Sequence, residues 1–213
     1  MLIVDFIFRW LHLLAGITWI GLLYYFNFIQ GGYFKAATPE GLADAKAKLA
    51  PEALWWFRWA AMLTFITGVL LLGSLHGKSL LNDYIVLGAL MGTFMFLNVW
   101  LIIWPKQQIA LGMKEGDGAA AGAAALLASR TNTLFSAPMA FGMLAGPHFG
   151  GYGRLFAEGG SGGGLGFMLA LIVILLLEGN AIKGKLGPMT TVKGVIHSSL
   201  GLTVVIFGLA YYL

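Results

Sequence analysis

The chain has 213 residues, of which 59% are hydrophobic and 10% are charged, and its sequence contains no cysteine. Because soluble domains carry about 25% charged residues, a water-soluble domain of this size could not hide so much apolar surface. The lack of cysteine excludes disulfides, zinc knuckles and thiolate-held iron–sulfur clusters. The net charge of +4 comes from basic residues in short loops between apolar stretches, where they orient a membrane protein rather than bind nucleic acid.

Apolar stretches of about 20 residues predict an all-α integral membrane protein with one domain, residues 1–213, built as a bundle of about six transmembrane helices. The first stretch has no basic leader and no clear cleavage site, so we expect a retained helix and not a signal peptide. In chain order, the spans are predicted at about 2–29, 54–75, 84–104, 131–146, 165–178 and 192–213.

The connections between these spans are short or rich in small residues. A short amphipathic piece over 39–49 precedes the second span, and the alanine-rich residues 119–128 predict an interfacial helix before the fourth. Pro138 inside the fourth span predicts a kink. The glycine-rich residues 150–166 lack the Gly-Lys-Ser/Thr ending of a phosphate-binding loop, so we expect a plain connection there.

The distribution of lysine and arginine predicts the orientation in the membrane. Ten of these residues fall in or beside the loops that follow the first, third and fifth spans. The opposite side has only Arg9, Lys78 and Arg154. Since basic residues concentrate in cytoplasmic loops, both termini are predicted to be non-cytoplasmic.

The first span carries polar residues that do not suit lipid. They recur at helical spacing, so one face of this helix is expected to point into the bundle. That face is either a polar seam that holds helices together or the wall of a functional cavity. Its residues are Asp5, Arg9, His12, Gly16, Trp19 and Asn27.

Four histidines are candidate ligands. His12 and His197 lie inside apolar spans, each with a glycine one turn later, which clears space for a flat macrocycle or for close helix packing. His76 and His148 end the second and fourth spans on the non-cytoplasmic side, which is also the side nearer to His12 in the predicted orientation. Two separate regions therefore fit the predicted depths better than one four-histidine cluster. His76, beside Gly77, is most simply a loop-end residue.

A second polar group is predicted nearer the opposite membrane surface. Arginine and amide side chains that meet there could bind a small planar anion, although helix capping and snorkelling charges explain them as well. This group comprises Asn27, Arg58, Asn98, Arg130, Thr131, Asn132 and Glu178. The i,i+4 pairs Met91/Met95 and Met139/Met143 could ligate copper(I) or a haem iron, but apolar packing is the usual role of methionine.

Four segments carry a family resemblance: RWLHLLAGITWIGLLYYFNFIQ, PEALWWFRWAAMLTFITGVLLL, GTFMFLNVWLIIWPKQQ and ASRTNTLFSAPMAFGMLAGPHF. They resemble, in order, segments of the bacterial membrane-bound urate hydroxylases, which are cytochrome-c-linked urate oxidases. The resemblance covers about the first 150 residues and implies a multi-pass protein of the bacterial inner (cytoplasmic) membrane. The first helix also resembles the opening of the bacterial four-helix protoporphyrinogen oxidases, which are associated with haem. The positions that match the segments of the urate hydroxylases are Arg9, His12, Trp19, Arg58, Trp59, Asn98, Trp100, Trp104, Arg130, Asn132 and His148.

The resemblance implies redox chemistry with a separate acceptor. Full-length family members continue into a cytochrome c domain with a Cys-x-x-Cys-His motif, which this sequence lacks. We therefore expect a haem-b-binding membrane redox protein that passes electrons to a separate periplasmic cytochrome c, and urate is the substrate that the family suggests.

Specific roles follow from this hypothesis. His12 is expected to be one axial ligand of the haem iron and His148 the second, with His197 and His76 as reserves. Arg9 would pair with a propionate and Trp19 would pack on the macrocycle. Bound urate, or another small planar anion, would be anchored by Arg58 and Arg130 and would accept hydrogen bonds from Asn98 and Asn132.

Two other classes of function remain open on the sequence. A non-catalytic accessory subunit of a larger membrane (respiratory) complex would explain the small size and the small-residue helix faces. A transporter is less attractive, because no inverted repeat is visible among the spans. All three readings place the chain in a lipid bilayer.

Overall fold

A computed structural model describes residues 2–78, 80–149 and 162–213, and these residues form helices and connections with no β-strand among them. The predicted glycine-rich connection over 150–166 lies mostly outside these described residues. The long helices are α1 (Leu2–Tyr24), α4 (Ala50–Gly77), α5 (Asp83–Leu97), α7 (Gly118–His148), α8 (Leu165–Lys183) and α9 (Val192–Tyr212). The short helices are α2 (Gly31–Ala36), α3 (Pro39–Asp44), α6 (Trp104–Ala110) and the 3-10 turn η4 (Gly187–Thr190), and the π-helical segments are η1 (Tyr25–Gln30), η2 (Ala45–Leu49) and η3 (Asn98–Ile103).

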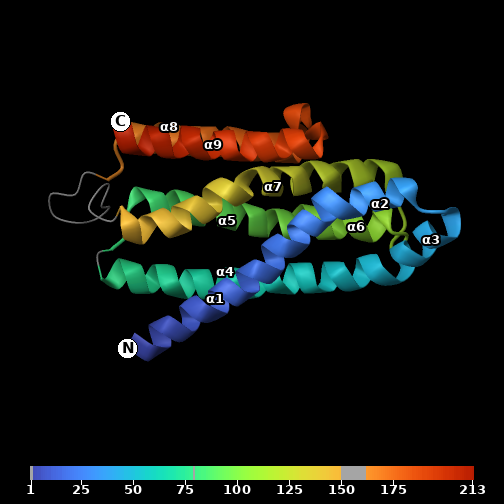
Figure 1. Ribbon diagram of the computed structural model, residues 1–213, viewed down its shortest axis with the longest axis horizontal. Coiled ribbons are helices and arrows are strands. Elements are labelled where there is room, and N and C mark those ends of the chain that lie inside the picture. Colours follow the sequence, from blue (N-terminus) through green and yellow to red (C-terminus); the bar gives the residue numbers. More distant parts are fainter. Residues whose placement is uncertain (1, 79, 150–161) are drawn as a thin grey trace.

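Each long helix reverses the direction of the one before it, and α1 crosses α4 obliquely (Figure 1). Both chain termini therefore lie at the same end of the bundle, which we call the terminal end (Figure 1). The opposite end holds α2, α3 and the connection from α6 to α7. The assignment of the terminal end to the non-cytoplasmic side stays a prediction from the charge distribution.

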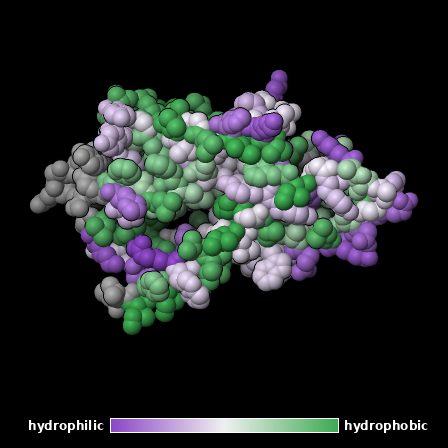
Figure 2. All heavy atoms as spheres, viewed as in Figure 1, coloured by the Kyte–Doolittle hydropathy of each residue, from purple (hydrophilic) through white to green (hydrophobic). Residues whose placement is uncertain are grey.

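Five stretches of the described chain are long and apolar enough to cross a membrane: Ile3–Ala36, Pro39–Gly77, Asp83–Ala110, Leu165–Lys183 and Val192–Tyr212. Figure 2 agrees, because hydrophobic residues cover much of the middle of the molecule while hydrophilic residues gather toward its ends. The predicted span 131–146 is part of α7, which is one continuous helix from Gly118 and is not among the five. The many small and polar residues of α7 lower its hydropathy. Nearly half of the residues of this helix are buried against other helices.

Helices α3, α5, α7 and α9 begin where a side chain accepts a hydrogen bond from a free backbone N–H group. Asn82 accepts from the amide of Ile85 at 3.1 Å and opens α5. Asp117 accepts from the amides of Ala119 and Ala120, both at 3.0 Å, and opens α7. Such caps satisfy donors that have no partner inside the helix, so the polar residues in the loops set where the apolar helices start.

Glycines bring α5 and α7 into close contact. A Cβ atom on Gly142 would lie 2.6 Å from the carbonyl oxygen of Tyr84 and 3.0 Å from the Cα of Gly88, so neither backbone leaves room for a side chain. These glycines belong to the sequences GALMG (88–92) and GMLAG (142–146), whose small residues let the two helix backbones approach each other. The contact holds α5 against α7, which carries six of the fourteen buried polar or charged residues of the described chain.

Pro138 lies inside α7 and removes the amide that would bond the carbonyl of Leu134. The hydroxyl of Ser199 on α9 donates to this carbonyl at 2.8 Å. A neighbouring helix thus satisfies the backbone group that proline frees, as a helix in lipid requires.

We expect Ser199→Ala to lower the free energy of unfolding by about 1–3 kcal/mol, because it leaves the buried Leu134 carbonyl without a donor. In a Pro138→Ala background the restored amide can bond that carbonyl, so the same change should cost less. Thermal unfolding in detergent measures both, with Ser198→Ala as the matched control. Equal costs in the two backgrounds would contradict the proposed link between Pro138 and Ser199.

Candidate functional site

The polar face of α1 packs against α4, and His12 is held there by two threonines. Its Nδ1–H donates to the carbonyl of Thr64 at 2.9 Å and lies 3.0 Å from the hydroxyl of Thr67. The Thr67 hydroxyl itself donates to the Leu63 carbonyl at 2.7 Å, so it can only accept from His12. Since a carbonyl oxygen cannot donate, the proton of the neutral imidazole is on Nδ1. The Nε2 lone pair is therefore available to a ligand.

A glycine on α4, and not the predicted Gly16, makes the space beside this imidazole. A Cβ atom on Gly68 would lie 3.1 Å from His12 Cε1. Gly16 instead faces Thr64, whose methyl group would be 4.0 Å from an added Cβ. The helical spacing of glycine and histidine in one helix was thus a poor guide, because the glycine that matters belongs to the neighbouring helix.

His12 lines a cavity of about 280 Å³ in the terminal half of the bundle. A hollow is visible in this part of the surface in Figure 2. The walls come from α1, α4, α5 and α7 and are mostly apolar, and the buried indole Nε1 of Trp19 finds no partner in the described part of the chain. We call this space the His12 cavity. Its lining is Arg9, His12, Leu13, Trp19, Thr64, Phe65, Gly68, Val69, Leu71, Leu72, Leu75, Ile85, Ala89, Gly92, Thr93, Met139 and Met143.

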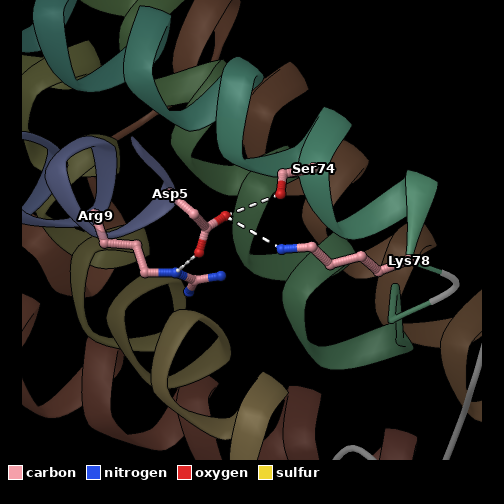
Figure 3. A network of polar contacts seen from close by, with 4 residues as sticks. All are labelled: Asp5, Arg9, Ser74 and Lys78. Atoms are coloured by element: carbon pink, nitrogen blue, oxygen red, sulfur yellow. Dashed lines mark hydrogen bonds and ion pairs between the residues drawn. The ribbon is translucent and has the colours of Figure 1, made fainter. Parts of the chain in front are cut away.

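A charged network joins α1 to α4 at the terminal end beside the cavity (Figure 3). Asp5 accepts from Arg9 Nε at 2.8 Å and from the Ser74 hydroxyl at 2.8 Å, and its Oδ1 lies 3.5 Å from Lys78 Nζ. Two cations share one carboxylate, which leaves a net positive charge there. Arg9 belongs both to this network and to the cavity wall.

The structure gathers part of the predicted haem set. Arg9, His12 and Trp19 line the one cavity, and Met139 and Met143 enter it from α7. His148 is exposed at the end of α7, His76 is exposed near the end of α4, and His197 is exposed on α9. These three histidines are not among the residues that line the His12 cavity.

The predicted second polar group forms a buried network in the opposite half of the bundle. Asn98, at the start of η3, donates through Nδ2 to Asn132 Oδ1 at 3.0 Å and to Glu178 Oε2 at 3.1 Å. Asn132 donates in turn to the carbonyl of Met95 at 2.9 Å. We call Asn98, Asn132 and Glu178 the amide–carboxyl network. The Asn98 amide nitrogen donates to two protein acceptors and the Asn132 amide nitrogen to one, and the role of these amides as donors to a substrate stays a prediction.

Two arginines near this depth carry donors without partners. Arg130 is only 8% exposed, its Nη1 lies 3.5 Å from the Thr191 carbonyl, and its Nε is unpaired among the described residues. The guanidinium of Arg58 lies 3.7 Å over the Trp104 ring, with Nη1 buried and unpaired in the same part of the chain. A buried guanidinium with so few partners is costly unless an anion or water completes it.

Further unpaired atoms lie on the π-helical segments η1 and η3. They are the side-chain oxygens of Asn27 and Gln30 and the indole nitrogen of Trp100, each buried without a partner in the described chain. π-helical turns are rare and are often found at functional sites. Sequence patterns did not indicate these segments, because their backbone geometry leaves no spacing signal.

The described residues contain no cluster of three or more histidine, cysteine, aspartate or glutamate side chains that could hold a metal ion. Any metal held by this part of the protein would therefore need other ligands or a prosthetic group of its own.

Gly68→Ala tests the packing around His12. Alanine in a helix interior is favoured over glycine by about 1 kcal/mol, but at Gly68 the added methyl meets the imidazole. We expect this gain to be absent or reversed at Gly68 and present in Gly73→Ala, where no atom lies within 4 Å of the added carbon. Thermal unfolding of both variants measures the difference. Equal stabilisation would show that the imidazole does not occupy this space.

Comparison with known proteins gives one match. A family model described as "Urate oxidase N-terminal" matches residues 78–158, which include α5, η3, α6 and α7. No curated protein and no solved structure matches the chain. The matched segment supplies Met139 and Met143 of the His12 cavity and Asn98, Arg130 and Asn132 of the second polar region. Over this segment the chain is similar to urate oxidases, which supports a urate-oxidase-related family.

Proposed function

We propose that the protein is a membrane-embedded redox protein related to urate oxidases, that the His12 cavity holds a haem b, and that electrons pass to a separate periplasmic cytochrome c. The observation that carries this proposal is the state of His12. Its Nδ1–H is bonded to a backbone carbonyl, which is the arrangement by which proteins fix the tautomer and orientation of a metal-ligating histidine.

The residues around His12 suit this group chemically. The wall is apolar, Gly68 leaves room beside the ring, and Arg9 supplies a cation for a propionate. Trp19, Phe65 and Ile85 would exclude water from the bound group. When bound, a haem supplies one-electron transfer, and the protein sets its potential through ligand identity and burial.

Two kinds of side chain could ligate the haem iron together with His12. The sequence favours His148, whereas the thioethers of Met139 and Met143 line the cavity with His12. A histidine–methionine pair would give the haem a higher reduction potential than a pair of histidines. Since the methionines share the cavity with His12, we expect one of them to be the ligand.

Absorbance spectra of the purified protein, oxidised and dithionite-reduced, test the haem proposal. A Soret band with sharp reduced α and β bands is expected, lost in His12→Ala and kept in the control His197→Ala. Met139→Leu or Met143→Leu should shift the bands and the reduction potential, and His148→Ala should not. A spectrum without these bands from haem-replete cells would contradict haem binding, and a shift only in His148→Ala would restore His148 as the ligand.

The substrate proposal rests on the buried arginines. Arg130 and Arg58 would anchor urate or another small planar anion, which would satisfy the donors that the described residues leave unpaired. Asn98 and Asn132 would then act indirectly, by fixing α5 against α7 beside Arg130.

We expect Arg130→Gln to weaken urate binding about tenfold or more, because a hydrogen bond to a charged group contributes about 1.5–3 kcal/mol. Equilibrium binding to the detergent-solubilised protein measures this. Lys106→Gln removes the same charge from an exposed position and serves as the control. Unchanged affinity in Arg130→Gln, or an equal loss in both variants, would exclude Arg130 as an anchor.

A further inference from the structure

Glu178 is a buried carboxyl group that the redox proposal does not use. It lies on α8, five residues before the helix ends at Lys183, inside a stretch long and apolar enough to cross a membrane. The residue is 9% exposed, and its carboxyl group accepts a hydrogen bond from the side-chain amide of Asn98 at 3.1 Å. A carboxyl group in such a place marks a functional site by default.

No cation neutralises this carboxyl group in the described part of the chain. The ion pairs found there involve Asp5 and Asp44, and none involves Glu178. Of the charged or titratable groups on the helices packed against α8, Arg130 on α7 is bonded to the Thr191 carbonyl, and Lys193 and His197 on α9 are exposed. Lys183 on α8 is exposed as well, and Asp83 lies at the other end of α5.

An unpaired carboxylate at this depth would lose its hydration without gaining a counter-ion, which costs several kcal/mol or more. Binding a proton removes that cost. The remaining carbonyl oxygen of the neutral acid can still accept from Asn98, as Oε2 does here. The amide–carboxyl network therefore suits a carboxylic acid better than a carboxylate.

The network also fixes the position of the acid. Asn98 uses one amide nitrogen for both Asn132 and Glu178, and Asn132 is tied to the Met95 carbonyl. Asn98 begins the π-helical segment η3, a local irregularity of the kind that recurs at functional sites. A purely adhesive contact between helices needs neither an ionisable group nor this backbone irregularity.

We propose that Glu178 is a proton-binding site in the membrane interior, loaded as a carboxylic acid at neutral pH and held by Asn98. One proton adds to one carboxylate oxygen and leaves from it, and no other reactant takes part. This inference does not depend on haem or on urate, so either could fail while the other holds.

Infrared spectroscopy of the purified full-length protein in lipid tests this inference. The wild type at neutral pH should show the carbonyl stretch of a carboxylic acid above the amide I band. Glu178→Gln should remove it, since the amide keeps an acceptor for Asn98 but cannot bind the proton. Asp83→Asn, which changes the other strongly buried acid among the described residues, should leave the band in place.

Two further measurements need no substitution at Glu178. Carbon-13 labelling of glutamate carboxyl groups should shift the band in the wild type, where the other described glutamates, Glu40, Glu52 and Glu115, are exposed. Asn98→Ala should move the band to higher frequency, because the carbonyl loses a donor. The absence of the band at neutral pH, its persistence in Glu178→Gln, or its loss in Asp83→Asn would each overturn the proposal.

Discussion

Polar groups inside this bundle must find their partners within the protein, because hydrocarbon offers none. The rest of the structure follows from that constraint. The carbonyl that Pro138 frees accepts a hydrogen bond from Ser199 of another helix. The imidazole of His12 donates a hydrogen bond to a backbone carbonyl of α4. Asn98 of η3 donates hydrogen bonds to Asn132 of α7 and to Glu178 of α8. Each of these bonds also fixes how two helices cross. The hydrogen bonds of the buried polar groups and the packing of the helices are therefore determined together.

The same constraint makes the exceptions informative. Most buried polar atoms in native proteins have partners, so the unpaired atoms of Trp19, Arg58 and Arg130 call for a ligand or for water. They fall into two groups at different depths, one beside the His12 cavity and one near the π-helical segments. That separation agrees with the proposal of a cofactor at one level and an anion at another, with the proton site of Glu178 close to the second.

The family match and the structure bear on different parts of this proposal. The match covers α5 to α7, which form one side of the His12 cavity and carry Arg130. The histidine itself, its threonine partners and Gly68 belong to α1 and α4, outside the match. The relation to urate oxidases therefore concerns the shared framework, whereas the haem proposal depends on how α1 and α4 meet it.

Much of the fold could be predicted from the sequence, because span length, apolar content and helical spacing are local properties. They predicted six spans, five of which overlap the apolar stretches of the structure, and they predicted the inward polar face of α1. They divided α7 into an interfacial helix and a span, whereas the structure has one continuous helix that protein surrounds over nearly half of its residues.

The sequence by itself determined that polar residues lie at two depths in an apolar bundle, since composition and helical period already separate them. Only the tertiary structure decided which of them meet. His12 pairs with Thr64 across 52 positions, and the cavity takes Met139 and Met143 but not His148 or His197. These outcomes depend on crossing angles and helix rotation, which arise from the packing of whole helices. No local pattern in the sequence encodes them.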